Sequence, residues 1–525
     1  MTLESTLGDA AIEQNLEQFL LVLSVSLSVA TISRIFAWFR KIPYTLLLVI
    51  AGLILSIVNV RLVNLSPELI LEIFLPPLLF EAAWNIRWRN LRRDLAPVTL
   101  FAVVGVIISI GGIAIAINQL AGIPLPIALL VGASLSATDP VSVIALFREL
   151  GASKRLTMLM EGESLFNDGV AVVAFSLLVG IPLGTAEFSM STTLATFFVF
   201  VGIGIGVGSL IGFGISFLTQ RFDLPLVEQS LTLVSAYGTY LITEELGGSG
   251  VISVVTVGII LGNFGSRIGM NPRTRLIVSE FWDFLAFFVN SIVFLLIGDQ
   301  IDFSSLANNL DLIAVTIAAV LLTRAIAIYG LAAISNWVAK SDIGWRDQTV
   351  LWWGGLRGSV SIAIALSVPV ILPDRQDIID TVFGVVLFTL LVQGLSTQFL
   401  LSKLNLVGDQ PLRQQYSEAN ARRVALNRVL HALSDPSRYP GIDSEFFRYQ
   451  QGLVKGQLNG IEDEMAKLQR EHPQLRELNV EQMREELLDI EADTYAEFIR
   501  AGRLNNQLSP LLQEVLIEAD EKLLE

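Results

Sequence analysis

Long apolar runs separated by short polar or basic stretches fill most of the chain. Each run has roughly 17–25 residues, the length that an α-helix needs to cross the hydrocarbon core of a bilayer. The pattern predicts thirteen spanning helices, at about 17–38, 43–60, 68–86, 95–120, 126–147, 156–182, 193–219, 224–246, 250–265, 276–299, 308–337, 348–372 and 377–402. The run at 250–265 is the shortest of these. We therefore expect an all-α polytopic membrane protein.

Basic residues in the loops test this layout and give it a direction. One set of alternate loops holds fifteen lysines and arginines, and the other set holds only Arg61 and Arg375. The basic set consists of Arg40, Lys41, Arg87, Arg89, Arg92, Arg93, Arg148, Lys154, Arg155, Arg221, Arg267, Arg273, Arg275, Lys340 and Arg346. The positive-inside rule places this set in the cytoplasm, so we expect the N-terminus outside and the C-terminus inside. A miscounted helix would have mixed the two sets.

The last segment, 403–525, has a different composition from the rest of the chain. It is rich in Glu, Arg, Gln and Leu and carries more acid than base. Apolar residues recur at helical spacing, as in Leu475, Leu478, Met483, Leu487 and Leu488. We expect a cytoplasmic helical tail that packs on itself or on a partner copy, with a regulatory role as the alternative. The chain then divides into an extracytoplasmic segment 1–16, a transmembrane domain 17–402 and the tail 403–525.

Composition excludes several classes of function. The chain is 53% hydrophobic and 16% charged, with a mean hydropathy of +0.62 and a net charge of −15, which argues against nucleic acid as a partner. It has no cysteine, and its two histidines, His431 and His472, lie in the tail, so a thiolate or histidine metal site within the membrane is excluded. No H-E-x-x-H, G-x-S-x-G or P-loop is present. We expect neither an enzyme nor a cofactor, and the acidic N-terminus predicts no cleavable signal peptide.

Ionisable residues at mid-membrane depth are costly, so they are candidates for function. The first lies in Ser136-Ala-Thr-Asp-Pro-Val-Ser142, where Asp139 is roughly 20 Å into its helix. Pro140 cannot donate a backbone hydrogen bond and disfavours helix at the residue before it. Freed carbonyls beside a carboxylate indicate a cation site in a broken helix that lines a cavity. A simple proline kink would explain Pro140 but not Asp139.

The second candidate is Glu161-Gly-Glu-Ser-Leu-Phe-Asn-Asp168. At the helical spacing, its polar residues share one face, an arc of about 140°; they are Glu163, Ser164, Asn167 and Asp168. Asp168 is roughly 18 Å into this helix, at a depth similar to that of Asp139 because the two helices run in opposite directions. An interhelical polar clamp would suit asparagine and serine, but an aspartate in lipid must be paired or protonated.

The third candidate is Gly354-Gly-Leu-Arg-Gly-Ser-Val-Ser361, whose glycines permit an unwound backbone. Arg357 is again at mid-depth, roughly 14 Å into its helix. It is either a clamp for an anion or a fixed countercharge for a carboxylate. Because carboxylates are in excess nearby, we expect a countercharge with Glu163 as its partner. Two further mid-depth residues, Glu81 and Arg324, are a candidate structural pair.

The helices of Asp139 and Arg357 are the fifth and the twelfth, seven positions apart. An odd offset reverses direction, so helices 1–6 and 8–13 are predicted to be inverted repeats with discontinuous helices 5 and 12. Paired interrupted helices at matching positions of inverted repeats are typical of a transporter site.

These three segments resemble the cation/proton antiporters of the NhaP type, relatives of the eukaryotic sodium/proton exchangers. The matching stretches are Ala137-Thr-Asp-Pro-Val141, Glu163-Ser-Leu-Phe-Asn-Asp168 and Gly354-Gly-Leu-Arg-Gly-Ser359, and the similarity covers about 15–402. The resemblance implies thirteen helices, a six-helix core domain that moves against a dimerisation domain, and a homodimer. It also implies an ion site of Asp168, Ser164, Glu163, Thr138 and the backbone around Asp139, with Asn167 and Arg357 holding Glu163 in place.

We accordingly expect a secondary active antiporter that exchanges Na⁺ or Li⁺ for H⁺, as in ion homeostasis and pH regulation, from a bacterial plasma membrane. Desolvation lets Asp168 hold either a proton or a dehydrated cation, and hard oxygen ligands at Asp168, Ser164 and Thr138 suit Na⁺. Asn167 stands where a second titratable carboxylate could be, which indicates electroneutral exchange. The alternatives are a K⁺/H⁺ antiporter of the same fold, an ion channel or anion transporter that uses Arg357, and a receptor that depends on the tail.

Overall fold

The structure, a computed structural model, describes residues 2–36, 42–58, 65–185, 189–220, 224–301, 303–407, 410–434, 443–472 and single positions between 475 and 498. Within these residues the chain is helical and has no strands, as predicted. It divides into two compact units, Met1–Arg148 with Ala152–Leu406, and Glu149–Gly151 with Val407–Glu525.

Helices account for every predicted spanning segment of the first unit. The first half contains α1 (Thr2–Ile35), α2 (Tyr44–Ile57), η2 (Leu69–Phe74), α3 (Leu75–Asn85), α4 (Trp88–Arg93), α5 (Leu95–Thr99), η3 (Leu100–Val104), α6 (Gly105–Ala121), α7 (Leu125–Ser134), α8 (Val141–Leu150) and α9 (Lys154–Leu178). The second half contains α10 (Met190–Thr219), α11 (Pro225–Glu245), α12 (Gly250–Ile260), η4 (Leu261–Gly269), α13 (Pro272–Asp299), α14 (Phe303–Asn308), α15 (Leu310–Ala339), α16 (Trp345–Trp353), α17 (Ser359–Leu366), α18 (Arg375–Phe388), η5 (Thr389–Gly394) and α19 (Leu395–Lys403).

Two helical segments are longer in the structure than the sequence predicts. Helix α1 begins at Thr2 instead of residue 17, and the short segment at 250 continues through η4 to Gly269. Five of the described helical stretches are long and apolar enough to cross a membrane by themselves, and four shorter helices are also apolar. The count of thirteen membrane crossings therefore stays a prediction.

Both predicted interruptions are confirmed. Helix α7 ends at Ser134 and α8 begins at Val141, and helix α16 ends at Trp353 and α17 begins at Ser359. Pro140 and the glycines around Arg357 lie inside these two breaks. The sequence features that interrupt the helices therefore act locally, as expected from backbone geometry.

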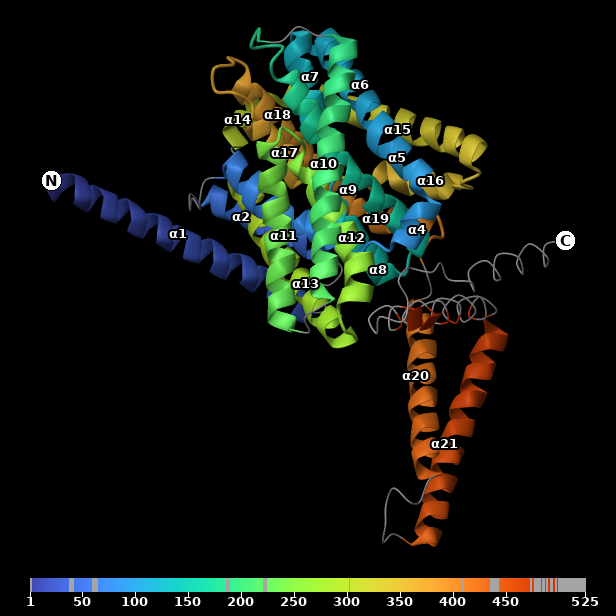
Figure 1. Cartoon of the computed structure of the whole chain (residues 1–525). Coiled ribbons are helices and arrows are strands. Elements are labelled where there is room, and N and C mark those ends of the chain that lie inside the picture. The colour runs from blue at the N-terminus through green and yellow to red at the C-terminus, as the bar shows by residue number, and fades with distance from the viewer. Residues whose placement is uncertain are drawn as a thin grey trace. The chain divides into compact units, whose positions relative to one another are not determined.

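The helices of the first unit pack mainly within two groups. The first group contains α1, α2, η2–α3, α10, α11, α12–η4 and α13, and the second contains α5–η3–α6, α7, α9, α15, α16, α17 and α18–η5–α19. We count α8 with the second group because it follows α7 across the break. In Figure 1, α10, α11 and α12 of the first group lie side by side. Fewer contacts join the groups, chiefly from α9 to α12, α10 and α3 and from α17 to η2 and α13.

Packing follows the pattern expected of two repeats. If each spanning segment is exchanged with the segment seven positions before or after it, the pair α2–α13 becomes α12–α3, and the pair of α7–α8 with α9 becomes the pair of α16–α17 with α18–η5–α19. The pair α6–α15 maps onto itself. At the α2–α13 crossing, Gly52 lies against Gly298, with an ideal Cβ on Gly298 only 3.0 Å from the Gly52 Cα. Backbones approach this closely only where side chains are absent.

The second unit contains α20 (Gln410–Leu433) and α21 (Ser444–Glu471), which pack against each other. Its buried cluster consists of Tyr416, Ala419, Met465, Leu468 and Leu475. Of the predicted apolar stripe, Leu475 is thus buried, whereas Met483 and Leu487 are exposed. Leu478 and Leu488 lie outside the described residues.

Candidate ion-binding site

The two helix breaks meet in the second group, where their backbones are joined directly. The Asp139 amide donates to the Leu356 carbonyl at 2.8 Å. The Arg357 guanidinium is fully buried and donates through Nη1 to the carbonyls of Ser136 (3.0 Å) and Ala137 (2.9 Å). These carbonyls lie in the break just after the end of α7, so Arg357 places positive charge close to a helix C-terminus.

Asp139 binds backbone amides at the starts of the two helices that follow the breaks. Its carboxylate accepts a hydrogen bond from the Val141 amide at 3.2 Å and another from the Ser359 amide, so it lies at the start of both α8 and α17. A Cβ at Gly358 would overlap this carboxylate, so glycine is required there for the close approach. Negative charge at two helix N-termini is favourable. Asp139 thus binds the starts of two helices, and its part in the ion site, implied by the resemblance, stays a prediction.

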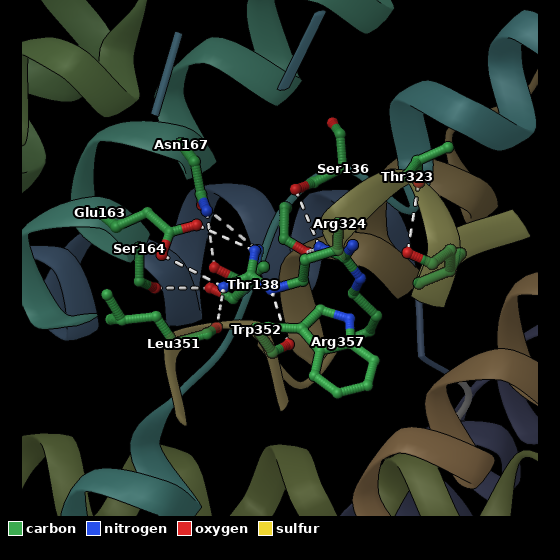
Figure 2. A network of polar contacts seen from close by, with 12 residues as sticks. Ser136, Thr138, Glu163, Ser164, Asn167, Thr323, Arg324, Leu351, Trp352 and Arg357 are labelled. Atoms are coloured by element: carbon green, nitrogen blue, oxygen red, sulfur yellow. Dashed lines mark hydrogen bonds and ion pairs between the residues drawn. The ribbon is translucent and has the colours of Figure 1, made fainter. Parts of the chain in front are cut away.

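The polar face of helix α9 contacts the break between α7 and α8. Ser164 Oγ donates to the Thr138 carbonyl at 2.5 Å, and Asn167 Nδ2 donates to Thr138 Oγ1 at 2.6 Å. Asn167 Oδ1 in turn accepts from the Thr138 amide at 3.2 Å. Figure 2 shows Glu163, Ser164 and Asn167 of this face around Thr138. Ser164 and Asn167 thus both contact Thr138, and the ion-binding role of this face stays a prediction.

Asp168 is buried on the same helix and has a free oxygen. Its carboxylate Oδ1 has no hydrogen-bond partner among the described residues, and neither do Nε and Nη2 of Arg357. Asp139 and Arg357 both lie near enough to act electrostatically on Asp168. A buried carboxylate oxygen without a partner is costly unless it takes up a proton or a cation.

The predicted partner of Glu163 was wrong. Glu163 forms a two-pronged ion pair with Arg324 of α15, with Nη1–Oε1 at 2.9 Å and Nη2–Oε2 at 3.2 Å, and not with Arg357. Arg324 also donates to the carbonyls of Trp352 (3.2 Å) and Leu351 (2.9 Å) at the end of α16. The expected pair of Glu81 with Arg324 is consequently also wrong.

The physical reason is that each arginine binds backbone carbonyls near the end of another helix. Arg357 lies in the break itself and donates to the carbonyls of the other break, so a second arginine is needed for Glu163. Glu81 instead accepts from Asn85, one turn along α3, at 2.6 Å. Asn167, implied by the resemblance to hold Glu163, holds Thr138. The signal that could have identified Arg324 was its mid-depth position, since a buried arginine requires a buried carboxylate.

The oxygen atoms at the crossing of the two breaks are of the types that bind small hard cations. No group of three or more His, Asp or Glu side chains that could hold a metal occurs in the part of the chain that the structure describes. Oxygen atoms of Asp168, Ser164 and Thr138 lie at the crossing, and carboxylate, hydroxyl and carbonyl oxygens are the ligands that small hard cations prefer.

Comparison with known proteins identifies the family. The model of the family described as "Sodium/hydrogen exchanger, transmembrane" matches residues 24–403. The Na⁺/H⁺ antiporter ApNhaP of Aphanothece halophytica is 68% identical over 99% of this chain and 100% of its own length. The low-affinity Na⁺/H⁺ antiporter NhaS1 of a Synechocystis strain is 62% identical over 96% of each chain.

A solved structure supports the fold. The sodium proton antiporter MjNhaP1 of Methanocaldococcus jannaschii, determined at pH 8, matches with a TM-score of 0.61 at 22% identity, covering 75% of this chain and 99% of that one. The chain belongs to the sodium/hydrogen exchanger family.

Proposed function

We propose that this protein is a secondary active antiporter that exchanges Na⁺ or Li⁺ for H⁺ at Asp168. The observation that carries the proposal is the buried Asp168 carboxylate with an unpartnered oxygen, next to the crossing of two broken helices. The names of the relatives described above, all Na⁺/H⁺ antiporters, support the choice of cation and of coupling.

The mechanism is a competition for one carboxylate. Asp168 binds either a proton or a cation, because both neutralise the same charge in surroundings that disfavour a bare carboxylate. Ser164 and Thr138 contribute hydroxyl and carbonyl oxygens, and Asn167 keeps Thr138 in position through two hydrogen bonds. The charge of Glu163 is already paired with that of Arg324, which leaves Asp168 as the carboxylate without a countercharge bonded to it.

Access from both sides requires the second group of helices to move against the first. We propose that Asp168 crosses the barrier only when loaded, since moving an unpaired charge through the bilayer is expensive. The fixed charges of the crossing, Asp139 and Arg357, travel with it because they are bonded to the ends of broken helices in the same group.

The remaining features of the proposal concern the whole protein. Residues 17–402 form the transmembrane domain, residues 1–16 lie outside and residues 403–525 form a cytoplasmic tail. Two copies form a homodimer in a bacterial plasma membrane, in which lipid surrounds the apolar exterior. Loop charge supports this orientation.

Proteoliposomes test the proposal. We expect Na⁺ or Li⁺ gradients to drive proton flux that a chloride gradient does not drive, and Asp168→Asn to abolish this flux while the variant remains folded. Asp283→Asn, which removes an exposed carboxylate from α13, is the matched control and should leave exchange intact. Normal exchange by the Asp168→Asn variant would show that another group carries the ion, and K⁺-driven flux without Na⁺-driven flux would overturn the choice of cation.

A further inference from the structure

The short helix α4, between α3 and α5, carries a cluster of arginines that lack acidic partners. Arg87, Arg92 and Arg93 are exposed and Arg89 is half-buried. Among the described residues, none of these four guanidinium groups forms an ion pair or a hydrogen bond. By contrast, Arg155, which lies close by in the structure, donates to Asp94 through Nε and Nη2. The protein thus neutralises neighbouring arginines but leaves these four unpaired.

An exposed tryptophan accompanies the arginines. Trp88 is 45% exposed, whereas Leu91 of the same helix is fully buried and anchors α4 to the bundle. Tryptophan prefers the boundary between hydrocarbon and water, and basic clusters directly beside a spanning helix attract anionic lipids. Arginine is also well matched to phosphate, because its planar guanidinium donates two parallel hydrogen bonds.

Both ends of α4 are held, each by a different group of helices. At its start, Asn263 of η4 accepts from the Trp88 amide at 2.7 Å and donates to the Ile86 carbonyl at 2.8 Å. At its end, Asp94 is paired with Arg155 of α9, with the closest atoms 2.6 Å apart, and Arg155 also donates to the Ser341 carbonyl. The four arginines are therefore presented on a fixed segment that joins the first group to the second.

We propose that α4 is a docking surface for the headgroups of anionic phospholipids. Charge complementarity and the neighbouring Trp88 favour a lipid over a soluble anion, because a soluble anion would leave the exposed indole without an apolar partner. An acidic protein segment would bind the arginines equally well but would not place acyl chains beside Trp88. The surface consists of Arg87, Trp88, Arg89, Arg92 and Arg93.

Fluorescence quenching by brominated lipids measures the lipid that contacts Trp88. The full chain is reconstituted into equal mixtures of phosphatidylglycerol and phosphatidylcholine, with bromine on the acyl chains of one or the other. The contribution of Trp88 is the difference between the native protein and Trp88→Phe. We expect brominated phosphatidylglycerol to quench Trp88 more strongly than brominated phosphatidylcholine. Arg92→Gln/Arg93→Gln should weaken this preference on the order of tenfold, because each arginine near the surface adds to the attraction.

A second double variant separates a specific surface from general charge. Arg273→Gln/Arg346→Gln removes two exposed arginines that the same topology places in the cytoplasm, and it should leave the preference unchanged. Arg87→Gln/Arg89→Gln serves if the first variant does not fold, as judged by its melting temperature and elution profile. Equal quenching by the two lipids in the native protein, or equal loss in the control variant, would overturn the proposal. Release of the quenching by inorganic phosphate or by a polyglutamate peptide would point to a soluble anion or an acidic protein instead.

Discussion

At the scale of single residues, the site separates charges that are neutralised from one charge that is not. Arg357 and Asp139 neutralise the ends of broken helices, and Arg324 neutralises Glu163. Asp168 is left with a buried oxygen that has no partner among the described residues. This division supports the proposal that Asp168 alone exchanges ions although several ionisable groups are buried together.

The buried ion pair gives a prediction about stability. Arg324→Leu should destabilise the protein by about 3–5 kcal/mol, because it leaves Glu163 buried without its countercharge. The double variant Glu163→Leu/Arg324→Leu should be more stable than Arg324→Leu alone, since no charge is then left unpaired. Thermal unfolding of the purified variants measures both effects.

The exposed pair of Arg148 with Glu161 is the matched control. Arg148 is 66% exposed as a side chain, so Arg148→Leu should change the unfolding free energy by less than about 1 kcal/mol. If Arg324→Leu were as stable as Arg148→Leu, the pair would not contribute to the fold and Glu163 would be protonated instead.

At the scale of helices, one buried hydrogen bond joins the two groups beside the site. Thr45 of α2 and Ser142 of α8 have their hydroxyl oxygens 2.5 Å apart, and both residues are buried. The chain has no cysteine, so a pair introduced here can react only with itself. In Thr45→Cys/Ser142→Cys we expect a disulfide on oxidation, because the side chains already point at each other within bonding range.

That disulfide should stop exchange, and a reductant should restore it. Proton flux in proteoliposomes with and without oxidant measures the effect, and the Thr45→Cys single variant serves as the control. Full activity of the crosslinked protein would mean that α2 and α8 do not separate during the cycle, which contradicts movement of the second group against the first at this point.

A glycine crossing within the first group should be sensitive to a single methyl group. Gly298→Ala is expected to lower the unfolding free energy by about 1–3 kcal/mol, because the new Cβ overlaps the Val49 carbonyl across the crossing. Gly238→Ala on α11 is the matched control, since no atom lies within 4 Å of its Cβ position. Equal melting temperatures for the two variants would show that α2 and α13 can move apart without cost.

The helices and the site differ in how far the sequence alone predicts them. The breaks were predictable because Pro140 and the glycines around Arg357 act through local backbone geometry. The face of α9 was predictable because its spacing is that of a helix. The partner of Glu163 was not, because Arg324 is brought to it by the packing of α15, which no local pattern records.

At the scale of the whole molecule, the two units differ in their relation to the site. Every residue of the candidate ion site belongs to the first unit, and the second unit has a buried cluster of its own around Tyr416 and Met465. Truncation after Leu406 should therefore leave Na⁺-driven proton flux in proteoliposomes, with any change confined to its regulation. Loss of flux from a truncated protein that still elutes as a folded species would show that the tail is needed for transport itself.

The pairing of charges around Asp168 also determines whether membrane voltage, in addition to the ion gradients, affects the proposed exchange. The charges of Asp139, Glu163, Arg324 and Arg357 sum to zero, so a single proton or a single Na⁺ on Asp168 leaves the site electrically neutral in either case. Under the proposed exchange of one Na⁺ for one H⁺, membrane voltage neither drives nor opposes the turnover. Net transport stops when the ratio of Na⁺ inside to outside equals the same ratio for H⁺. Exchange would thus bring the Na⁺ ratio across the membrane to the value of the H⁺ ratio. At given external concentrations, a cell that holds its internal pH constant would thereby set its internal sodium concentration.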